Sequence, residues 1–288
     1  MPSGNLKSVN RRSILKTASA LTVPNFLPKN VFGANEKKIN IAWVGFGNMG
    51  WGDLNNCANG NNVVALCDCN PGTWERAKKK YPKAKFYKDF RKMLEEMGDQ
   101  IDAVGVGTPD HTHFAITYMA MSMGKHVFVE KPMCLSELQL KKIYQLLKIK
   151  KKLKITSNLV LRTNSLFKQL KKKINKKNLY YLEADYLWGR SSKLYGWRSK
   201  INHYSVIYGA AIHMIDIIVW LIGLKPISVN SFGNDIVTKN SVFKKKSFVV
   251  MIFEFPNNIL VKITGNAPAI YDHYHEIKIF SKNKTLVN

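Results

Sequence analysis

The sequence predicts an α/β fold, with a doubly wound parallel sheet in its first half. One observation is a short apolar run, residues 39–44, that ends directly in a glycine-rich turn at 45–50. A second is another apolar run, 62–67, which ends on an acid, Asp68. A third is the alternation of strand-like and helix-like patterns that follows. This alternation is typical of consecutive βαβ units, whose strands lie parallel.

The turn at residues 45–50 has the spacing Gly-x-Gly-x-x-Gly. In this pattern Gly45 permits a tight turn, and Gly47 lets the backbone approach a pyrophosphate. Gly50 lets the following helix pack closely on its strand. The free N–H groups at the start of that helix would bind the phosphates. Because chance loops also match this spacing, the prediction of a dinucleotide site depends on the neighbouring strands.

Asp68 ends the second predicted strand, eighteen residues beyond Gly50. A carboxylate is expected at about this distance, where it accepts hydrogen bonds from ribose hydroxyls. It would repel a 2′-phosphate, and no arginine follows it directly, so NAD is expected rather than NADP. The alternative is that Asp68 is a surface acid that caps a helix at residues 71–80.

The elements that follow keep the same order. Strands are expected at 85–87, 103–107 and 127–129, and helices at 90–97 and 114–123. Ser136 would begin another helix, with Gln139 three residues later in a capping-box arrangement. Polar stretches follow two of these strands, at 108–111 and at 130–132. Ligands of such sheets bind at the carboxyl ends of the strands, so both stretches are candidates for the site.

The net charge is +26, with 45 Lys and Arg residues against 19 Asp and Glu. Such an excess is compatible with nucleic acid, a membrane surface or a phosphorylated substrate. However, the lysine runs are scattered, and no predicted helix or strand gathers them with interleaved aromatic residues. A solvated surface is therefore preferred, and no nucleic-acid partner is expected. Attraction for a dinucleotide follows under either interpretation.

Residues 205–224 are nearly all apolar, which raises the question of a membrane span. The segment contains His213 and Asp216, which are costly in lipid. A buried helix of a soluble domain is the better interpretation, and no membrane partner is expected.

The four cysteines are Cys57, Cys67, Cys69 and Cys134, and they form no Cys-x-x-Cys pair. Cys67 and Cys69 are expected to face the same side of one strand, where they are poorly placed to form a disulfide. The spacing does not resemble a zinc site. All four are interpreted as buried small hydrophobic residues or incidental thiols, and no metal site is expected.

Residues 1–36 resemble a twin-arginine export leader. Arg11 and Arg12 precede an apolar stretch at 17–27, and small residues follow at 33–34, as at a cleavage site. Export to the periplasm is therefore expected. The alternative is an uncleaved N-terminal arm on a cytoplasmic protein.

Four stretches together resemble one family. They are residues 44–50, 107–113 (GTPDHTH), 124–132 (GKHVFVEKP) and 213–216 (HMID). From about residue 37 onward the chain resembles the glucose–fructose oxidoreductase / inositol dehydrogenase / MocA (Gfo/Idh/MocA) family. The Glu-Lys-Pro stretch after a glycine-turn strand is much more specific than either motif alone.

The resemblance implies an NAD-binding Rossmann domain at 37–157 and a substrate and oligomerisation domain at 158–288. The second domain would be α+β, with an open, mostly antiparallel sheet whose exposed face often pairs, so a homo-oligomer is expected. Its strands are expected at 179–187, 227–232, 248–255, 260–264 and 274–279.

The resemblance also implies roles for individual residues. Lys131 would lie beside the nicotinamide as an acid/base or as the group that orients the substrate hydroxyl. His213 would act as general base or hold the substrate, although a lone helical histidine is more often structural. Asp216, three residues later on the same helix face, would orient the helix or His213. Arg162 and Arg198 would clamp an anionic group of substrate or cofactor.

Two sets of site residues are thus predicted, with Lys131 and His213 as the catalytic pair. The residues predicted to bind the cofactor are Gly45, Phe46, Gly47, Asn48, Met49, Gly50, Asp68, Thr108, Pro109, His111, His113, Glu130 and Lys131. The residues predicted to bind substrate are Arg162, Arg198, Tyr208, His213 and Asp216.

Two features depart from the family pattern. Many relatives have an aspartate four residues before the histidine, where this chain has Gly209. This leaves more of the proton transfer to Lys131 and His213, with Tyr208 as a substitute for the aspartate. The chain also stops at Asn288, just after a stretch that resembles an inner strand of the family's sheet. A fragment or a shortened family member is therefore expected.

The function predicted on these grounds is NAD-dependent transfer of hydride to or from a hydroxyl-bearing carbon of a sugar, cyclitol or nucleotide-sugar. Two alternatives remain open. One is an NAD-dependent glycosidase of the same fold, which the export-like leader favours. The other is a non-catalytic dinucleotide-binding sensor, which Gly209 and the early stop favour.

Overall fold

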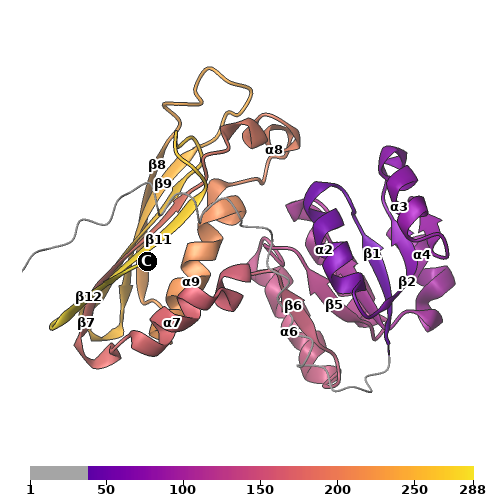
Figure 1. Cartoon of the computed structure of the whole chain (residues 1–288), viewed down its shortest axis with the longest axis horizontal. Coiled ribbons are helices and arrows are strands. Elements are labelled where there is room, and N and C mark those ends of the chain that lie inside the picture. Colours follow the sequence, from indigo (N-terminus) through magenta and orange to yellow (C-terminus); the bar gives the residue numbers. More distant parts are fainter. Residues whose placement is uncertain (1–37) are drawn as a thin grey trace, which may run out of the picture. The chain divides into compact units, whose positions relative to one another are not determined.

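The computed structural model of the protein describes residues 38–288. Figure 1 shows the order of the elements along this part of the chain. The predicted twin-arginine-like leader, residues 1–36, lies outside the described residues.

The first sheet has six strands, all parallel, in the order β3-β2-β1-β4-β5-β6. The strands are β1 (Asn40–Val44), β2 (Asn62–Cys67), β3 (Lys85–Tyr87), β4 (Ala103–Val106), β5 (His126–Val129) and β6 (Ile155–Ser157). The reversal of strand order between β1 and β4 confirms the predicted doubly wound sheet. The sequence analysis missed β6, a short strand whose three residues carry little pattern.

Helices cover both faces of this sheet. They are α2 (Asn48–Ala58), α3 (Trp74–Lys80), α4 (Phe90–Met97), α5 (His113–Ser122) and α6 (Glu137–Ile149). Successive residues of a strand point to opposite faces, and β1 is apolar on both. Trp43 packs with buried residues of α2 and α3, whereas Ala42 and Val44 pack with buried residues of α4, α5 and α6. Both faces of the sheet are therefore dry, as the continuous apolar runs predict.

Helix α6 begins close to the predicted capping box. The Ser136 hydroxyl accepts a hydrogen bond from the Gln139 backbone N–H at 3.3 Å. The Gln139 side chain returns to the N–H of Leu135, at 2.8 Å, one residue before the expected partner.

The second sheet also has six strands, in the order β12-β11-β7-β10-β9-β8. The strands are β7 (Leu179–Leu187), β8 (Ser228–Asn234), β9 (Phe248–Phe255), β10 (Ile259–Asn266), β11 (Tyr274–Ser281) and β12 (Lys284–Val287). The β7–β10 pair is parallel and the other pairs are antiparallel. The predicted open, mostly antiparallel sheet is thus confirmed, with β12 and β8 at its edges.

Helices α7 (Ser165–Lys173) and α9 (Ile212–Ile222) contribute to one hydrophobic core with this sheet. Leu182 and Ile263, from β7 and β10, are buried with Ile217 and Leu221 of α9. Figure 1 shows α9, in orange, running along the sheet. The core thus fixes α9, which carries His213.

Residues 205–224 form the predicted buried helix, but its start is irregular. A turn of π-helix at Ile207–Ala211 precedes α9. Within the described part of the chain, no helix combines the length and the apolar character needed to cross a membrane.

One expectation about the cysteines is wrong. Strand β2 ends at Cys67, which is buried, and Cys69 lies beyond it and is exposed. The two thiols therefore do not share a strand face.

Candidate active site

The glycine turn joins β1 to α2 in a close backbone packing. Gly45 has φ +80°, a left-handed conformation that favours glycine. A Cβ on Gly50 would collide with the carbonyl oxygen of Gly45, and a Cβ on Gly107 would lie 2.7 Å from that same oxygen. The end of β4 therefore packs directly on the turn, which only glycine at these positions allows.

Gly47 differs from its neighbours because no atom would lie within 4 Å of a Cβ placed on it. Helix α2 begins at the next residue, with no side-chain cap and no acidic residue in its first turn. Its first N–H groups therefore have no helical acceptor and can bind an anion. This open, donor-rich turn fits the pyrophosphate of a dinucleotide.

Asp68 follows β2 and lies against the same turn. Its Oδ2 accepts a hydrogen bond from the Phe46 N–H at 3.0 Å. The helical turn that follows is capped by Asn70 rather than Asp68, because the Asn70 side chain accepts from the Gly72 N–H. The helix-capping alternative is therefore wrong, and the carboxylate lies against the glycine turn, as the predicted ribose-binding role requires.

Arg76 is a residue of this region that the sequence analysis missed. Its guanidinium donates to the carbonyl oxygens of Phe46, at 2.6 Å, and Gly47, at 3.0 Å. It also lies 4.5 Å from the centre of the Trp51 ring. Arg76, which belongs to α3, thus holds the backbone of the glycine turn in place. The signal available in the sequence was a cation eight residues after Asp68.

Thr108 and His113 connect the two motifs at the ends of β4 and β5. The His113 ring nitrogens lie 2.7 Å from the carbonyl oxygens of Pro132 and Thr108. His113 is 1% exposed, so a direct contact with the cofactor, as predicted, is not open to it. Its ring instead connects the segment after β4 to the segment after β5. Pro109 and His111, in contrast, are exposed.

Glu130 belongs to a buried group of polar side chains beneath Lys131. Asn158 donates to Glu130 Oε1 at 2.5 Å and to Asp53 Oδ1 at 3.3 Å. The other Glu130 oxygen accepts from the Lys131 N–H at 3.1 Å. Burial, and then the Glu130 charge, raise the pKa of Asp53 to about 8. Asp53 is therefore protonated at neutral pH, beside an acid that orients the Lys131 backbone.

Lys131 reaches from the end of β5 to the π-helical turn before α9. Its Nζ donates to the carbonyl oxygen of Gly209 at 3.0 Å. His213 follows on the next turn and is 7% exposed, with its ring stacked on Tyr186 at 5.9 Å between centroids. Burial, and then the Lys131 charge, hold the pKa of His213 well below its ordinary value. The ring is therefore neutral at neutral pH and able to accept a proton.

Arg162 and Asp216 contact each other. Arg162 donates to both Asp216 oxygens, at 2.8 and 2.5 Å, in a bidentate pair. The predicted role of Arg162 changes as a result. Among the described residues Asp216 pairs with Arg162 and not with His213, so it fixes its own helix, which is one of the two roles predicted for it. Arg162 ties the segment after β6 to α9 rather than standing free to clamp an anion.

Tyr208 was predicted to replace the missing aspartate, but a different tyrosine stands at that place. The Tyr204 hydroxyl occupies the point where a Cβ on Gly209 would lie. Tyr204 is 4% exposed, and its hydroxyl has no hydrogen-bond partner among the described residues. Tyr208 is half-buried within the π-helical turn.

Two further histidines lie beside His213, and the sequence analysis did not select them. The rings of His273 and His275 lie 5.2 and 4.6 Å from the Tyr186 ring, between centroids. His275 pairs with Tyr186 across the β11–β7 ladder. The signal was their spacing of two, which places both side chains on one side of an extended strand.

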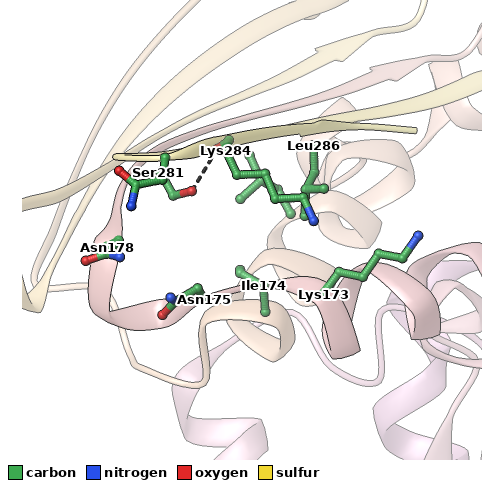
Figure 2. Close-up of a pocket in the computed structure, with 9 residues that line it drawn as sticks. Lys173, Ile174, Asn175, Asn178, Ser281, Lys284 and Leu286 are labelled. Atoms are coloured by element: carbon green, nitrogen blue, oxygen red, sulfur yellow. Dashed lines mark hydrogen bonds between the residues drawn. The ribbon is translucent and has the colours of Figure 1, made fainter.

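A separate hollow of about 240 Å³ lies between the end of α7 and the β11–β12 hairpin (Figure 2). Asn175 and Asn178 approach it from below the hairpin, and Lys284 and Leu286 approach it from β12. None of its lining residues belongs to the predicted site, and none is an acid or a histidine. The hollow therefore lacks the histidine or acidic group that the predicted chemistry needs as its base. Within residues 38–288, no group of histidine, cysteine or acidic side chains is arranged to hold a metal ion.

Two family models match the chain. The model described as "Oxidoreductase family, NAD-binding Rossmann fold" matches residues 39–158. The model of the "GFO/IDH/MocA C-terminal domain" matches residues 167–287. Together they cover both sheets.

Individual relatives agree with these matches. An inositol 2-dehydrogenase of Salmonella typhimurium is 24% identical over 244 residues, covering 81% of this chain and 69% of the relative. An α-N-acetylgalactosaminidase of Shewanella oneidensis is 28% identical over 163 residues, covering 46% of this chain and 35% of the relative. The structure of scyllo-inositol dehydrogenase from Lactobacillus casei, with NAD(H) and scyllo-inositol, is similar in fold. It has a TM-score of 0.78 at 20% identity, covering 88% of this chain and 76% of that one.

Proposed function

Because the chain belongs to the Gfo/Idh/MocA family of NAD-binding oxidoreductases, we propose that it oxidises a secondary hydroxyl of a sugar, cyclitol or nucleotide-sugar. The observation that carries the proposal is the placement of Lys131 and His213. Lys131 is anchored on Gly209, and His213 follows one helical turn later as a neutral ring. An ammonium and a proton acceptor at one place suit the removal of a hydroxyl proton.

The residues of the glycine turn, the first N–H groups of α2 and Asp68 would hold the cofactor. When bound, NAD supplies the hydride acceptor. A ring nitrogen of His213 would accept the hydroxyl proton of the substrate. The Lys131 ammonium would stabilise the negative charge that develops on that oxygen. The Glu130–Asn158–Asp53 group would hold Lys131 in position from below.

The test is formation of NADH, followed by its absorbance, with the full chain and a panel of inositols, sugars and nucleotide-sugars. We expect NADH with at least one member of the panel, and its loss in Lys131→Met. Lys142→Met is the matched control, because Lys142 is an exposed lysine of α6 outside the site. No NADH with any member, together with no binding of NAD, would overturn the proposal.

The glycosidase alternative is less favoured, because the glycosidase match covers 46% of this chain against 81% for the inositol dehydrogenase. Release of the leaving group from an aryl glycoside, without net NADH, would support the glycosidase. The sensor alternative predicts binding of NAD without turnover of any panel member.

We also propose a homo-oligomer formed through the outer face of the second sheet. Helices α7 and α9 pack on the other face. The outer face carries Phe232, Ile252 and Leu260, which are 71%, 37% and 45% exposed. The same face carries the ion-paired Glu183, Lys262 and Lys278, and a second copy would cover the exposed apolar side chains beside them. Light scattering should give a multiple of the chain mass, and Leu260→Lys should lower it.

For the leader at residues 1–36, we propose export by the twin-arginine route. The paired arginines, the apolar stretch and the small residues that follow support this. Fractionation of cells that express the full chain should find the protein in the periplasm. Arg11→Lys/Arg12→Lys should retain it in the cytoplasm.

A further inference from the structure

A group of cations follows β7 and lies beside the candidate site. The chain leaves β7 through Arg190, passes a 3₁₀ turn at Ser191–Leu194 that contains Lys193, and reaches Arg198 in α8 (Trp197–Lys200). Figure 1 shows α8 in the connection between β7 and α9. We call Arg190, Lys193 and Arg198 the cation cluster.

Gly189 explains why this segment lies against β11. It has φ +58°, and a Cβ on it would collide with the carbonyl oxygen of Tyr271. The backbone after β7 therefore passes directly over the residues that lead into β11. This contact brings Arg190 close to His273. Burial, and then the Arg190 charge, lower the pKa of His273, and burial, His273 and Arg190, in that order, lower the pKa of His275.

Aromatic rings hold Arg198 in place. Its guanidinium lies 4.2 Å from the centre of the Trp197 ring, 5.6 Å from that of Trp188 and 5.7 Å from that of Tyr204. It also donates to the Lys193 carbonyl oxygen at 3.4 Å. Stacking orients the guanidinium but leaves most of its N–H donors without an acceptor.

The charges of the cluster are not balanced. Within residues 38–288, none of its three members forms an ion pair. The charges of Arg190, Arg198 and Lys131 act together with burial to lower the pKa of Lys193. Like charges held this close are unfavourable unless an anion joins them. One acid, Asp110, lies on this side, since its charge acts on Tyr204. A single carboxylate does not balance the three cations.

Buried polar atoms without partners lie at the same place. They are Tyr204 Oη, on a side chain 4% exposed, and His213 Nδ1, on a side chain 7% exposed. His273 Nε2 is a third, and Asp110 Oδ2, a carboxylate oxygen, is a fourth. Buried polar atoms are almost always hydrogen-bonded in folded proteins, so this group of four without partners points to a ligand that also carries hydroxyl groups, which can donate to the Asp110 oxygen.

We propose that the cation cluster is an anion-binding subsite, and that the substrate is a sugar derivative with a carboxylate or phosphate group. The inference rests on the proposed dehydrogenase function and names its substrate class. The reacting hydroxyl lies toward Lys131 and His213, and the anionic group lies toward Arg190, Lys193 and Arg198. A neutral cyclitol would leave the cations unbalanced.

The kinetic test compares matched neutral and anionic compounds. The pairs are glucose with glucuronate, glucose with glucose 6-phosphate, and N-acetylglucosamine with UDP-N-acetylglucosamine. We expect kcat/KM to be at least about tenfold higher for the anionic member of one pair, since a charge-assisted pair is worth one tenfold step or more. The pair that responds separates a carboxylate from a phosphate.

Variants assign the preference to the cluster. Lys193→Gln and Arg198→Gln should raise KM for the anionic compound about tenfold, and the loss in kcat/KM should be smaller for its neutral partner. Lys200→Gln is the matched control, because Lys200 is an exposed cation of the same helix. Arg198→Gln removes a stacked side chain and could unfold the segment. Lys193→Gln does not remove that stacking, so it tests the subsite independently. Equal loss for both members of a pair would overturn the subsite.

A binding measurement separates this proposal from the dehydrogenase itself. Calorimetry with UDP, glucuronate and inorganic phosphate needs no turnover. Binding of one of them that is weakened in Lys193→Gln but not in Lys200→Gln supports the subsite, even if no NADH forms. NADH formation from neutral compounds alone, with no binding of the three anions, overturns the subsite and leaves the dehydrogenase standing.

Discussion

The hydroxyl of Tyr204 fills the space that a side chain on Gly209 would occupy. The family pattern predicts an aspartate at the position of Gly209. Here the space holds a phenol instead, and the Gly209 carbonyl accepts the hydrogen bond from Lys131. Burial raises the pKa of Tyr204, so its hydroxyl stays protonated. A neutral donor has thus taken the place of a carboxylate.

This packing predicts that Gly209→Ala is destabilising. A Cβ would collide with the Tyr204 ring, and overpacking of this kind costs about 1–3 kcal/mol in the free energy of unfolding. Gly52→Ala is the control, because a Cβ there meets no atom within 4 Å and alanine favours helix α2. Urea unfolding measures both. In a Tyr204→Leu background the cost of Gly209→Ala should fall, and an unchanged cost would show that the phenol is not the cause.

Two glycines of the cofactor turn should respond differently to alanine. Gly50→Ala should destabilise the fold, because its Cβ would collide with the Gly45 carbonyl. Gly47→Ala should leave the unfolding free energy within about 0.5 kcal/mol, since the space around it is open. However, it should weaken NAD binding, because the methyl group would enter the space for the pyrophosphate. Calorimetric titration with NAD checks this, and unchanged affinity in a folded Gly47→Ala would place the pyrophosphate elsewhere.

The parts of the molecule that the sequence predicted well depend on local pattern. The glycine turn, Asp68 and the strand–helix alternation each lie within short segments, and both sheets have the predicted character. The second half was predicted only through family resemblance, because no motif in its strands is diagnostic of this sheet.

The parts that were missed depend on contacts between distant segments. Asn158 meets Asp53 across 105 residues of sequence, and no local pattern announces that contact. Tyr208, the predicted substitute for the aspartate, is next to Gly209 in the sequence, whereas Tyr204 reaches Gly209 from five residues before it. The π-helical turn at Ile207–Ala211 changes which residue faces Gly209.

Asp53 predicts a loss of stability as the pH rises. Its folded pKa, about 8, is above its ordinary value of 3.8, so between these values the folded state holds a proton that the unfolded state has released. The free energy of unfolding should therefore fall by about 1.4 kcal/mol for each pH unit in that window. Asp53→Asn mimics the protonated acid and should remove this slope. Urea unfolding at about pH 5 and pH 8 measures it, and equal slopes in both proteins would contradict the assignment.

Lys131→Met should separate binding from turnover. Without the ammonium, no cation stabilises the developing negative charge on the substrate oxygen, and kcat should fall by about 10²–10⁴-fold. NAD affinity should be retained, because the turn at residues 45–50 and Asp68 do not depend on this side chain. The change also removes the hydrogen bond to Gly209, so circular dichroism must show an intact fold. A variant with normal kcat would assign the proton transfer to other groups.

His213 predicts sensitivity to acid. Its pKa in the folded protein is well below its ordinary value of 6.5, because burial and the Lys131 charge disfavour the cation. Below about pH 6.5 the unfolded state binds a proton that the folded state does not, so stability should be lost as the pH falls, by about 1.4 kcal/mol for each pH unit. His213→Gln cannot take up this proton and should show a shallower acid slope in urea unfolding. His111→Gln is the control, since His111 is exposed. An acid slope that is the same in His213→Gln and the unmodified protein would show that the fold does not lower the pKa of His213.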